Sequence, residues 1–201
     1  MLIGSVRSGV VEARHPVTVV AVDGDGRVLY REGEDQGTRF FFRSAAKPFQ
    51  ATVSRRLGLP LAPEQLALVS ASHGGQPIHA AMAAALLAEA GLGPEHLFCP
   101  PAWPAASSAV HRLGARGVAA PHRLFHNCSG KHSGMLRACV AQGWPLTYTD
   151  AAHPLQQTIR EEVSLSTRES PDPMGVDGCG VPTCSGTVTG LATAFARLAT
   201  D

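Results

Sequence analysis

The chain has 201 residues, of which 44% are hydrophobic and 16% are charged, and its formal net charge at pH 7 is +1. These values are typical of a soluble globular protein whose core is large enough to fold without disulfide bonds or structural metal ions. The scattered arginines form no basic stripe, so nucleic-acid binding is not expected. No apolar run has membrane-spanning length, and the first residues lack the pattern of a secretion signal. We therefore expect a cytoplasmic protein that does not bind membranes.

The cysteines are odd in number and come without a secretion signal, which argues against a disulfide framework. They are Cys99, Cys128, Cys139, Cys179 and Cys184. No two of them form a C-x-x-C pair, so neither a zinc ribbon nor a thioredoxin-type centre is expected. Thiolates that serve metal or redox chemistry remain open, as does burial in the core, the more common fate of free thiols.

The first forty residues indicate β-structure. Two β-rich runs, from Val10 to Val22 and from Arg27 to Tyr30, are joined by a turn at Asp23–Gly26, which predicts a hairpin. The turn fails the calcium-loop pattern because Arg27 and Val28 occupy its next two positions. An apolar segment at 38–42 then leads into a predicted helix from about Ala45 to Leu57.

The remainder of the chain indicates mainly helices separated by glycine-rich turns. Residues 63–69 form an apolar helix or strand, and residues 93–121 are rich in proline, glycine and alanine, as in a lid or a partner-binding edge. A short strand or turn is expected at 176–184. Helices are predicted at 77–90, around 107–113, from the segment 125–135 to 141, at 154–166 and around 191–198.

Ser44 and Lys47 stand three residues apart at the start of a predicted helix. Residues at i and i+3 share a helix face, so the serine hydroxyl and the lysine amine are expected within hydrogen-bond reach. The chain has only two lysines against fifteen arginines, and a buried lysine can lose its proton whereas arginine cannot. We interpret the pair as a nucleophile and its base. Capping by Ser44 would explain the serine but not the lysine.

Three other turns carry polar groups between small residues. Ser72 and His73 precede two glycines, which favours either an exposed hydroxyl close to a ligand or a plain turn with local caps. Cys179 lies between two glycines after Asp177, a poor design for a core and a good one for presenting a thiol. His122 and His126 have metal-ligand spacing, but the polar turn around them favours solvated or capping roles.

Four ordered motifs carry a family resemblance: Arg-Ser-x-x-Lys-Pro at 43–48, Ala-Ser-His at 71–73, Asn-Cys-Ser-Gly-Lys-His at 127–132 and Asp-Gly-Cys-Gly-Val-Pro at 177–182. Together they resemble the rhizobial-type L-asparaginases, from about Gly9 to the C-terminus. The resemblance implies hydrolysis of L-asparagine to L-aspartate and ammonia. It also implies an α+β fold like that of serine β-lactamases and penicillin-binding proteins, an antiparallel sheet with helices.

The resemblance also assigns roles to residues of this chain. Ser44 and Lys47 match one Ser-Lys pair, and Ser72 matches the serine of a second pair. A zinc ion, not essential for the chemical step, is implied beside them, and a homodimer is expected. Residues implied in substrate binding are Arg43, His73, His132 and Asp177, and those implied in zinc binding are Cys128, Lys131 and Cys179.

Members of that family continue well past position 201, and the lysine that partners the second serine lies in the part beyond it. The chain is therefore expected to be a single β-lactamase-like domain over 1–201 that is truncated at its C-terminus. Two other functions stay open. A β-lactamase or penicillin-binding-like acylase would also use Ser-x-x-Lys, although Ser-Asp-Asn and Lys-Thr-Gly are missing. A non-catalytic zinc-binding remnant of the fold would bind metal without turnover.

Overall fold

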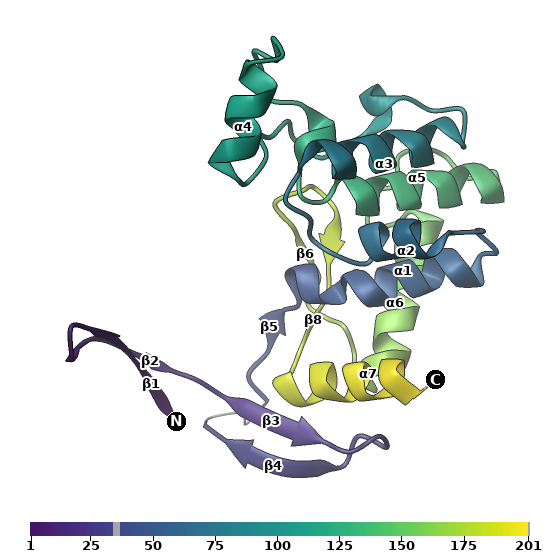
Figure 1. The fold of residues 1–201 in the computed structure, drawn as a ribbon. Helices are drawn as coiled ribbons and strands as arrows, with labels where there is room; N and C mark the ends of the chain where they lie inside the picture. Colours follow the sequence, from purple (N-terminus) through teal and green to yellow (C-terminus); the bar gives the residue numbers. More distant parts are fainter. Residues whose placement is uncertain (34–36, 201) are drawn as a thin grey trace. The chain divides into compact units, whose positions relative to one another are not determined.

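A computed structural model describes residues 1–33 and 37–200 (Figure 1). It combines helices with small antiparallel ladders, which confirms the α+β class. The chain divides into two compact units, each of which is described by itself. The first comprises Met1–Phe42, Val163–Met174 and Cys184–Asp201, and the second comprises Arg43–Glu162 and Gly175–Thr183. None of the helices in the described ranges is long and apolar enough to cross a membrane.

The first unit contains three two-stranded antiparallel ladders and a C-terminal helix. The expected hairpin around Asp23 is confirmed: the carbonyl of Asp23 accepts from Gly26 N at 3.0 Å, and its carboxylate accepts from Arg27 N at 2.8 Å. The ladders pair β1 (Leu2–Arg7) with β2 (Val10–Pro16), β3 (Val19–Val22) with β4 (Val28–Glu32), and β5 (Phe40–Phe41) with β8 (Ser185–Gly186), and the helix is α7 (Val188–Thr200).

The β1–β2 hairpin is an element that the sequence patterns did not predict. Its two-residue turn consists of Ser8 and Gly9, whose φ angles are 50° and 80°. Positive φ at both central positions is the geometry that matches the twist of a tight hairpin. The Ser-Gly dipeptide between two apolar runs was the available signal.

The second unit is mainly helical and contains the candidate site residues. The helices predicted from the sequence are confirmed in place, and the segment at 63–69 is a helix rather than a strand. Its elements are η1 (Arg43–Ala46), α1 (Lys47–Arg56), α2 (Pro63–Val69), α3 (Pro77–Ala88), η2 (Pro94–His96), α4 (Ser107–Gly114), η3 (Arg123–Phe125), α5 (Ser129–Gln142), β6 (Gly175–Val176), β7 (Pro182–Thr183) and most of α6 (Pro154–Thr167).

The helix that carries the Ser-x-x-Lys motif starts with a tight 3-10 turn, and α1 proper begins at Lys47. Pro48 explains the difference from the predicted start near Ala45. It lacks an N–H, so it cannot form the α-helical bond to the Ser44 carbonyl four residues back. The N-cap of α1 is Ala46, which makes no side-chain capping bond. Ser44 is therefore not the capping residue of α1.

Two glycines of α5 allow it to pack closely against α2. A Cβ atom at Gly130 would lie 2.6 Å from the side chain of Leu68 and 2.8 Å from its carbonyl oxygen. A Cβ atom at Gly134 would lie 2.9 Å from the side chain of Val69. Because α2 ends just before Ser72 and α5 begins next to Cys128, this contact brings the ends of two motif segments together.

Candidate active site

Lys47, Ser72 and Ser44 form one chain of hydrogen bonds. Lys47 Nζ lies 2.7 Å from Ser72 Oγ, and Ser72 Oγ lies 3.0 Å from Ser44 Oγ. Lys47 Nζ also donates to the carbonyl of Ala71 at 3.3 Å. Among the described residues no bond joins Lys47 directly to Ser44, so the direct pair expected from the i, i+3 spacing is replaced by a chain through Ser72. All three predicted residues are nonetheless brought together.

Lys47 has the environment of a lysine that gives up its proton. Its relative exposure is 0%. Burial lowers its pKa below the ordinary lysine value, and the positive charge of Lys131 adds to this effect, while a Cys128 thiolate would oppose it. A neutral amine here has a lone pair that can accept a serine proton.

Arg43 precedes Ser44 and is bound to the Asp-Gly-Cys-Gly turn. Its Nε lies 2.7 Å from Asp177 Oδ1, and its backbone N–H donates to Thr183 Oγ1 at 3.3 Å. The φ angle of Arg43 is 50°, in the left-handed region that an arginine rarely adopts. The arginine side chain remains 61% exposed although the Asp177 side chain is only 10% exposed. The pair thus presents guanidinium N–H groups to solvent beside Ser44.

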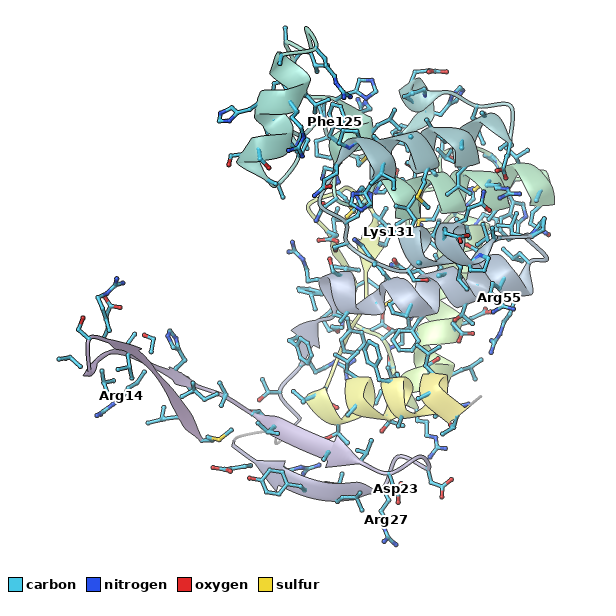
Figure 2. The ribbon with its side chains drawn as sticks, viewed as in Figure 1. Arg14, Asp23, Arg27, Arg55, Phe125 and Lys131 are labelled. Atoms are coloured by element: carbon cyan, nitrogen blue, oxygen red, sulfur yellow. The ribbon has the colours of Figure 1, made fainter. Side chains whose placement is uncertain are left out.

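The thiols of Cys128 and Cys179 are buried and shift each other's pKa, and Lys131 lies beside them. Lys131 lies on α5 and is labelled in Figure 2. Its Nζ lies 3.2 Å from Cys179 Sγ. A hydrogen bond from Cys128, together with His132 and Lys131, lowers the pKa of Cys179, whereas the bond to Cys179 and burial raise that of Cys128. Each sulfur also has an oxygen nearby: Cys128 Sγ lies 3.5 Å from Asn127 Oδ1, and Cys179 Sγ lies 3.7 Å from Asp177 Oδ2. The directions of the two pKa shifts make Cys179 the more acidic thiol of the pair.

His132 lies on the first turn of α5 and is completely buried. Burial lowers its pKa to about 4, so the imidazole is neutral at pH 7. Its Nδ1 lies 2.7 Å from Tyr148 Oη. No sequence pattern indicated Tyr148, which lies in the loop after α5. It contacts His132 only because the folded chain brings the two residues together.

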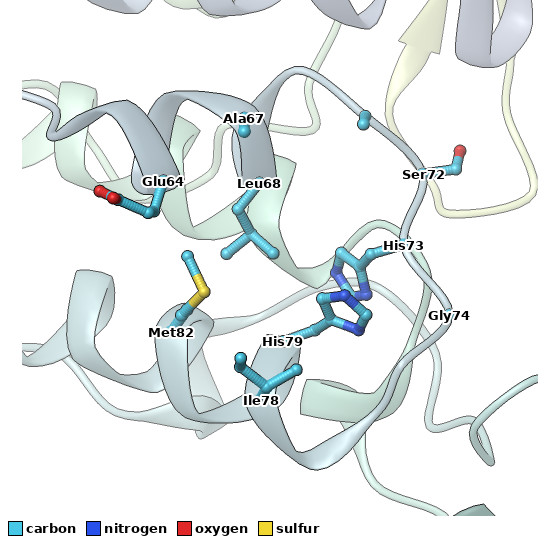
Figure 3. Close-up of a pocket in the computed structure, with 10 residues that line it drawn as sticks. Glu64, Ala67, Leu68, Ser72, His73, Gly74, Ile78, His79 and Met82 are labelled. Carbon is cyan, nitrogen blue, oxygen red and sulfur yellow. The ribbon is translucent and has the colours of Figure 1, made fainter.

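His73 and the pocket beside it lie on the other side of the Ser72 backbone (Figure 3). The pocket encloses about 510 Å³ between α2 and α3, with mainly apolar walls. Figure 3 shows the stacked rings of His73 and His79 facing this space, while the hydroxyl of Ser72 points away from it. This pocket is therefore not where a substrate would meet the serine, although Ser72 contributes to its lining.

Both ring nitrogens of His73 already have partners. Nδ1 accepts from Gly75 N at 3.1 Å, and Nε2 lies 3.1 Å from Ser129 Oγ. Burial lowers the pKa of His73 to about 4, so the ring is neutral. These contacts join the Ser-His-Gly-Gly turn to the start of α5, as local caps would. A contact between His73 and substrate remains a prediction.

His122 and His126 act as local caps, as the polar turn around them indicated. His122 Nδ1 accepts from Leu124 N at 3.2 Å, and His126 Nδ1 accepts from Cys128 N at 3.0 Å. His126 was not predicted as a site residue, yet it lies close to the charges of the site: burial lowers its pKa, Cys179 opposes this shift, and Lys47 and Lys131 add to it. The signal available in the sequence was its place two residues before Cys128.

The predicted zinc ligands come together in a form that suits a soft metal ion. Two adjacent thiols with an amine 3.2 Å from one sulfur match the preference of zinc for sulfur and nitrogen donors. Within the described ranges, no three His, Cys, Asp or Glu side chains are grouped to hold a metal. A zinc site here therefore depends on Lys131 as a neutral third ligand. All five cysteines are free rather than joined in disulfides.

The family comparison covers nearly the whole chain. The model of the L-asparaginase II family matches residues 3–201. No curated protein sequence matched the chain. The family match includes all four motif segments, from the Ser-x-x-Lys turn to the Asp-Gly-Cys-Gly turn. The chain belongs to the L-asparaginase II family.

Proposed function

We propose that this protein hydrolyses L-asparagine to L-aspartate and ammonia through an aspartyl-enzyme ester, within the β-lactamase-like fold that the motifs imply. The observation that carries the proposal is the hydrogen-bonded chain Lys47–Ser72–Ser44, with distances of 2.7 and 3.0 Å. Membership of the L-asparaginase II family supports the choice of an amide substrate. The buried amine supplies a base, and the two hydroxyls supply a nucleophile and a proton path.

Ser44 is the proposed nucleophile and Ser72 the proposed relay. Ser72 Oγ already has two partners, whereas Ser44 Oγ has only Ser72 within the described ranges. Ser44 attacks the side-chain amide carbon while its proton passes to Ser72 and the proton of Ser72 passes to Lys47. The resulting ammonium of Lys47 returns a proton to the leaving nitrogen, so that ammonia departs. Water then attacks the ester by the same path and releases aspartate.

The ion pair of Arg43 and Asp177 is proposed to hold the amino-acid end of the substrate. The outer N–H groups of Arg43 suit the α-carboxylate, because guanidinium binds carboxylates through paired hydrogen bonds. The Asp177 carboxylate suits the α-ammonium. A zinc ion held by Cys128, Cys179 and Lys131 would add a Lewis acid that orients the same end of the substrate. The proton path does not involve the metal.

Mass spectrometry of a trapped acyl-enzyme tests the proposal most directly. We expect ammonia release from L-asparagine, no hydrolysis of a chromogenic β-lactam, and a covalent aspartyl adduct on the peptide that contains Ser44. Ser44→Ala should lose the adduct and the turnover while the protein stays folded. Ser72→Ala should also lose turnover. An adduct on Ser72 would exchange the two roles, and metal binding without any ammonia release would refute the enzyme assignment.

A further inference from the structure

Arg43 is the first residue of the 3-10 turn that carries Ser44, and its backbone is left-handed. A residue with a Cβ atom keeps this conformation, here with φ at 50°, only where its surroundings hold it there. The backbone of Arg43 sets the direction in which the chain enters the turn, and therefore where the hydroxyl of Ser44 points. Contacts that hold Arg43 thus bear directly on the serine.

One hairpin of the second unit holds Arg43 at two points. The hairpin spans 175–183 and pairs β6 with β7, with Gly175 opposite Thr183. From β7, Thr183 Oγ1 accepts a hydrogen bond from the Arg43 N–H at 3.3 Å. From the connecting turn, Asp177 Oδ1 lies 2.7 Å from Arg43 Nε. The backbone and the side chain of Arg43 are therefore held by separate groups.

The contact with Thr183 is the one that acts on the backbone. The first N–H groups of a helical turn have no partner inside the turn, so the Arg43 N–H needs an acceptor from another element. Thr183 supplies it from a buried position, with a relative exposure of 4%. The ion pair with Asp177 has less influence on φ, because several rotatable bonds separate Arg43 Nε from the main chain.

We propose that Thr183 is a positioning residue, whose hydroxyl holds the left-handed backbone of Arg43 and thereby keeps Ser44 in hydrogen-bond contact with Ser72. The inference rests on the proposed function, in which Ser44 is the nucleophile. Thr183 acts through the main chain and takes no part in proton transfer. Asp177 holds the guanidinium separately, so the loss of the Thr183 hydroxyl should affect the chemical step more than substrate binding.

Substitutions at Thr183 separate its hydrogen bond from its shape. Thr183→Val keeps the volume and removes the acceptor, whereas Thr183→Ser keeps the hydroxyl. We expect Thr183→Val to lower kcat for ammonia release about 10²-fold, the effect of a misplacement of about 1 Å, with a smaller change in KM. Thr183→Ser should retain most of kcat. Thr183→Ala removes the same acceptor and replaces the valine variant if that variant does not fold.

Thr193→Val is the matched control for the loss of a buried threonine hydroxyl. Thr193 is 5% exposed and donates to the carbonyl of Thr189 within α7. Its substitution should leave kcat unchanged. A loss of kcat in Thr193→Val as large as in Thr183→Val would overturn the specific role of Thr183.

The Arg43→Gly background tests whether Thr183 acts through the backbone of Arg43. Glycine adopts a positive φ without strain, so the turn has less need of an external contact. The fold-loss of kcat caused by Thr183→Val should therefore be smaller in Arg43→Gly than in the wild type. An equal fold-loss in the two backgrounds would overturn this route.

Crystal structures of the full chain give a readout that does not depend on turnover. We expect a positive φ at Arg43 in the wild type and in Thr183→Ser. In Thr183→Val we expect a negative φ, with Ser44 Oγ beyond hydrogen-bond distance of Ser72 Oγ. An unchanged φ or an unchanged kcat in Thr183→Val would overturn the proposal. A wild type that releases no ammonia would refute the proposed function, and the φ angle would then decide by itself whether Thr183 holds Arg43.

Discussion

Lys47 is bonded to the serine of a different motif, Ser72, and not to Ser44, the serine of its own motif. The contact joins α1 to the turn after α2, so Lys47 links both motif segments. Since Ser72 stands between Lys47 and Ser44, the two hydroxyls would share one base and one proton path in the proposed mechanism. A substitution at any one of these three residues is therefore expected to disturb the hydrogen bonds of the other two.

Replacing Lys47 should remove the proposed base without unfolding the protein. Lys47→Met keeps most of the buried volume and Lys47→Arg keeps a positive charge, but neither can accept a proton. Both variants should lower kcat by about 10²–10⁴-fold, the usual contribution of a general base. Ammonia release would be measured alongside circular dichroism. Substantial turnover in Lys47→Arg would exclude Lys47 as the base.

The pH dependence of turnover should report the neutral form of Lys47. Burial lowers its pKa from the ordinary 10.5, so the base is neutral at a lower pH than a surface lysine. We expect kcat/KM to rise with pH through the lowered pKa and to reach its plateau before pH 10.5. A profile measured with L-asparagine checks this. A rise centred at the ordinary lysine value would contradict the prediction.

Arg43→Gly separates the charge of Arg43 from its unusual backbone. Glycine accepts a positive φ without strain, so the turn before Ser44 should keep its geometry while the guanidinium is lost. Loss of a charged hydrogen bond costs about 1.5–3 kcal/mol, and we expect KM for L-asparagine to rise about tenfold or more. Asp177→Asn should have a similar effect. An unchanged KM in both variants would show that this pair does not hold the substrate.

Cys128→Ser should remove zinc and affect binding more than chemistry. Because the proton path runs through Lys47, the loss of metal should raise KM more than it lowers kcat. Treatment of the wild type with a chelator should give the same kinetics. Cys139→Ser is a matched control, since Cys139 is buried like Cys128 but is not a proposed ligand. If elemental analysis finds no zinc and the kinetics of Cys128→Ser are unchanged, Cys128 is an ordinary buried core residue and not a metal ligand.

Acid should destabilise the protein through His73. Its pKa is about 4 in the folded protein and 6.5 in the unfolded reference. The unfolded chain therefore binds more protons in this interval, and the free energy of unfolding should decrease as the pH falls from 6.5 to 4. His73→Asn keeps a side-chain acceptor near Gly75 but cannot titrate. Urea unfolding at several pH values should show a weaker pH dependence in this variant.

Local patterns predicted much of the secondary structure because proline, glycine and apolar spacing act over a few residues. Pro77 begins α3, and the Asp23 turn closes a hairpin, as the sequence indicated. The four motifs also indicated the site residues that lie together in the second unit. The sequence predicted a hydrogen bond from Lys47 to Ser44, whereas the structure has one from Lys47 to Ser72. This could not be predicted, because the spacing of two residues along one helix gives no information about a hydroxyl on another element. The contact of Tyr148 with His132 was missed for the same reason.

The two glycines of α5 make the geometry of the candidate site depend on residues without reactive groups. At Gly130 the nearest obstacle includes the backbone oxygen of Leu68, which no side-chain change can remove. At Gly134 the obstacle is only the side chain of Val69, so a methyl group gained at 134 can be balanced by carbon lost at 69. We therefore expect no substitution to be tolerated at Gly130, whereas a substitution at Gly134 can be compensated by a smaller residue at position 69. A larger residue at 130 is expected to move α2 away from α5, and with it the serine turn from the start of α5.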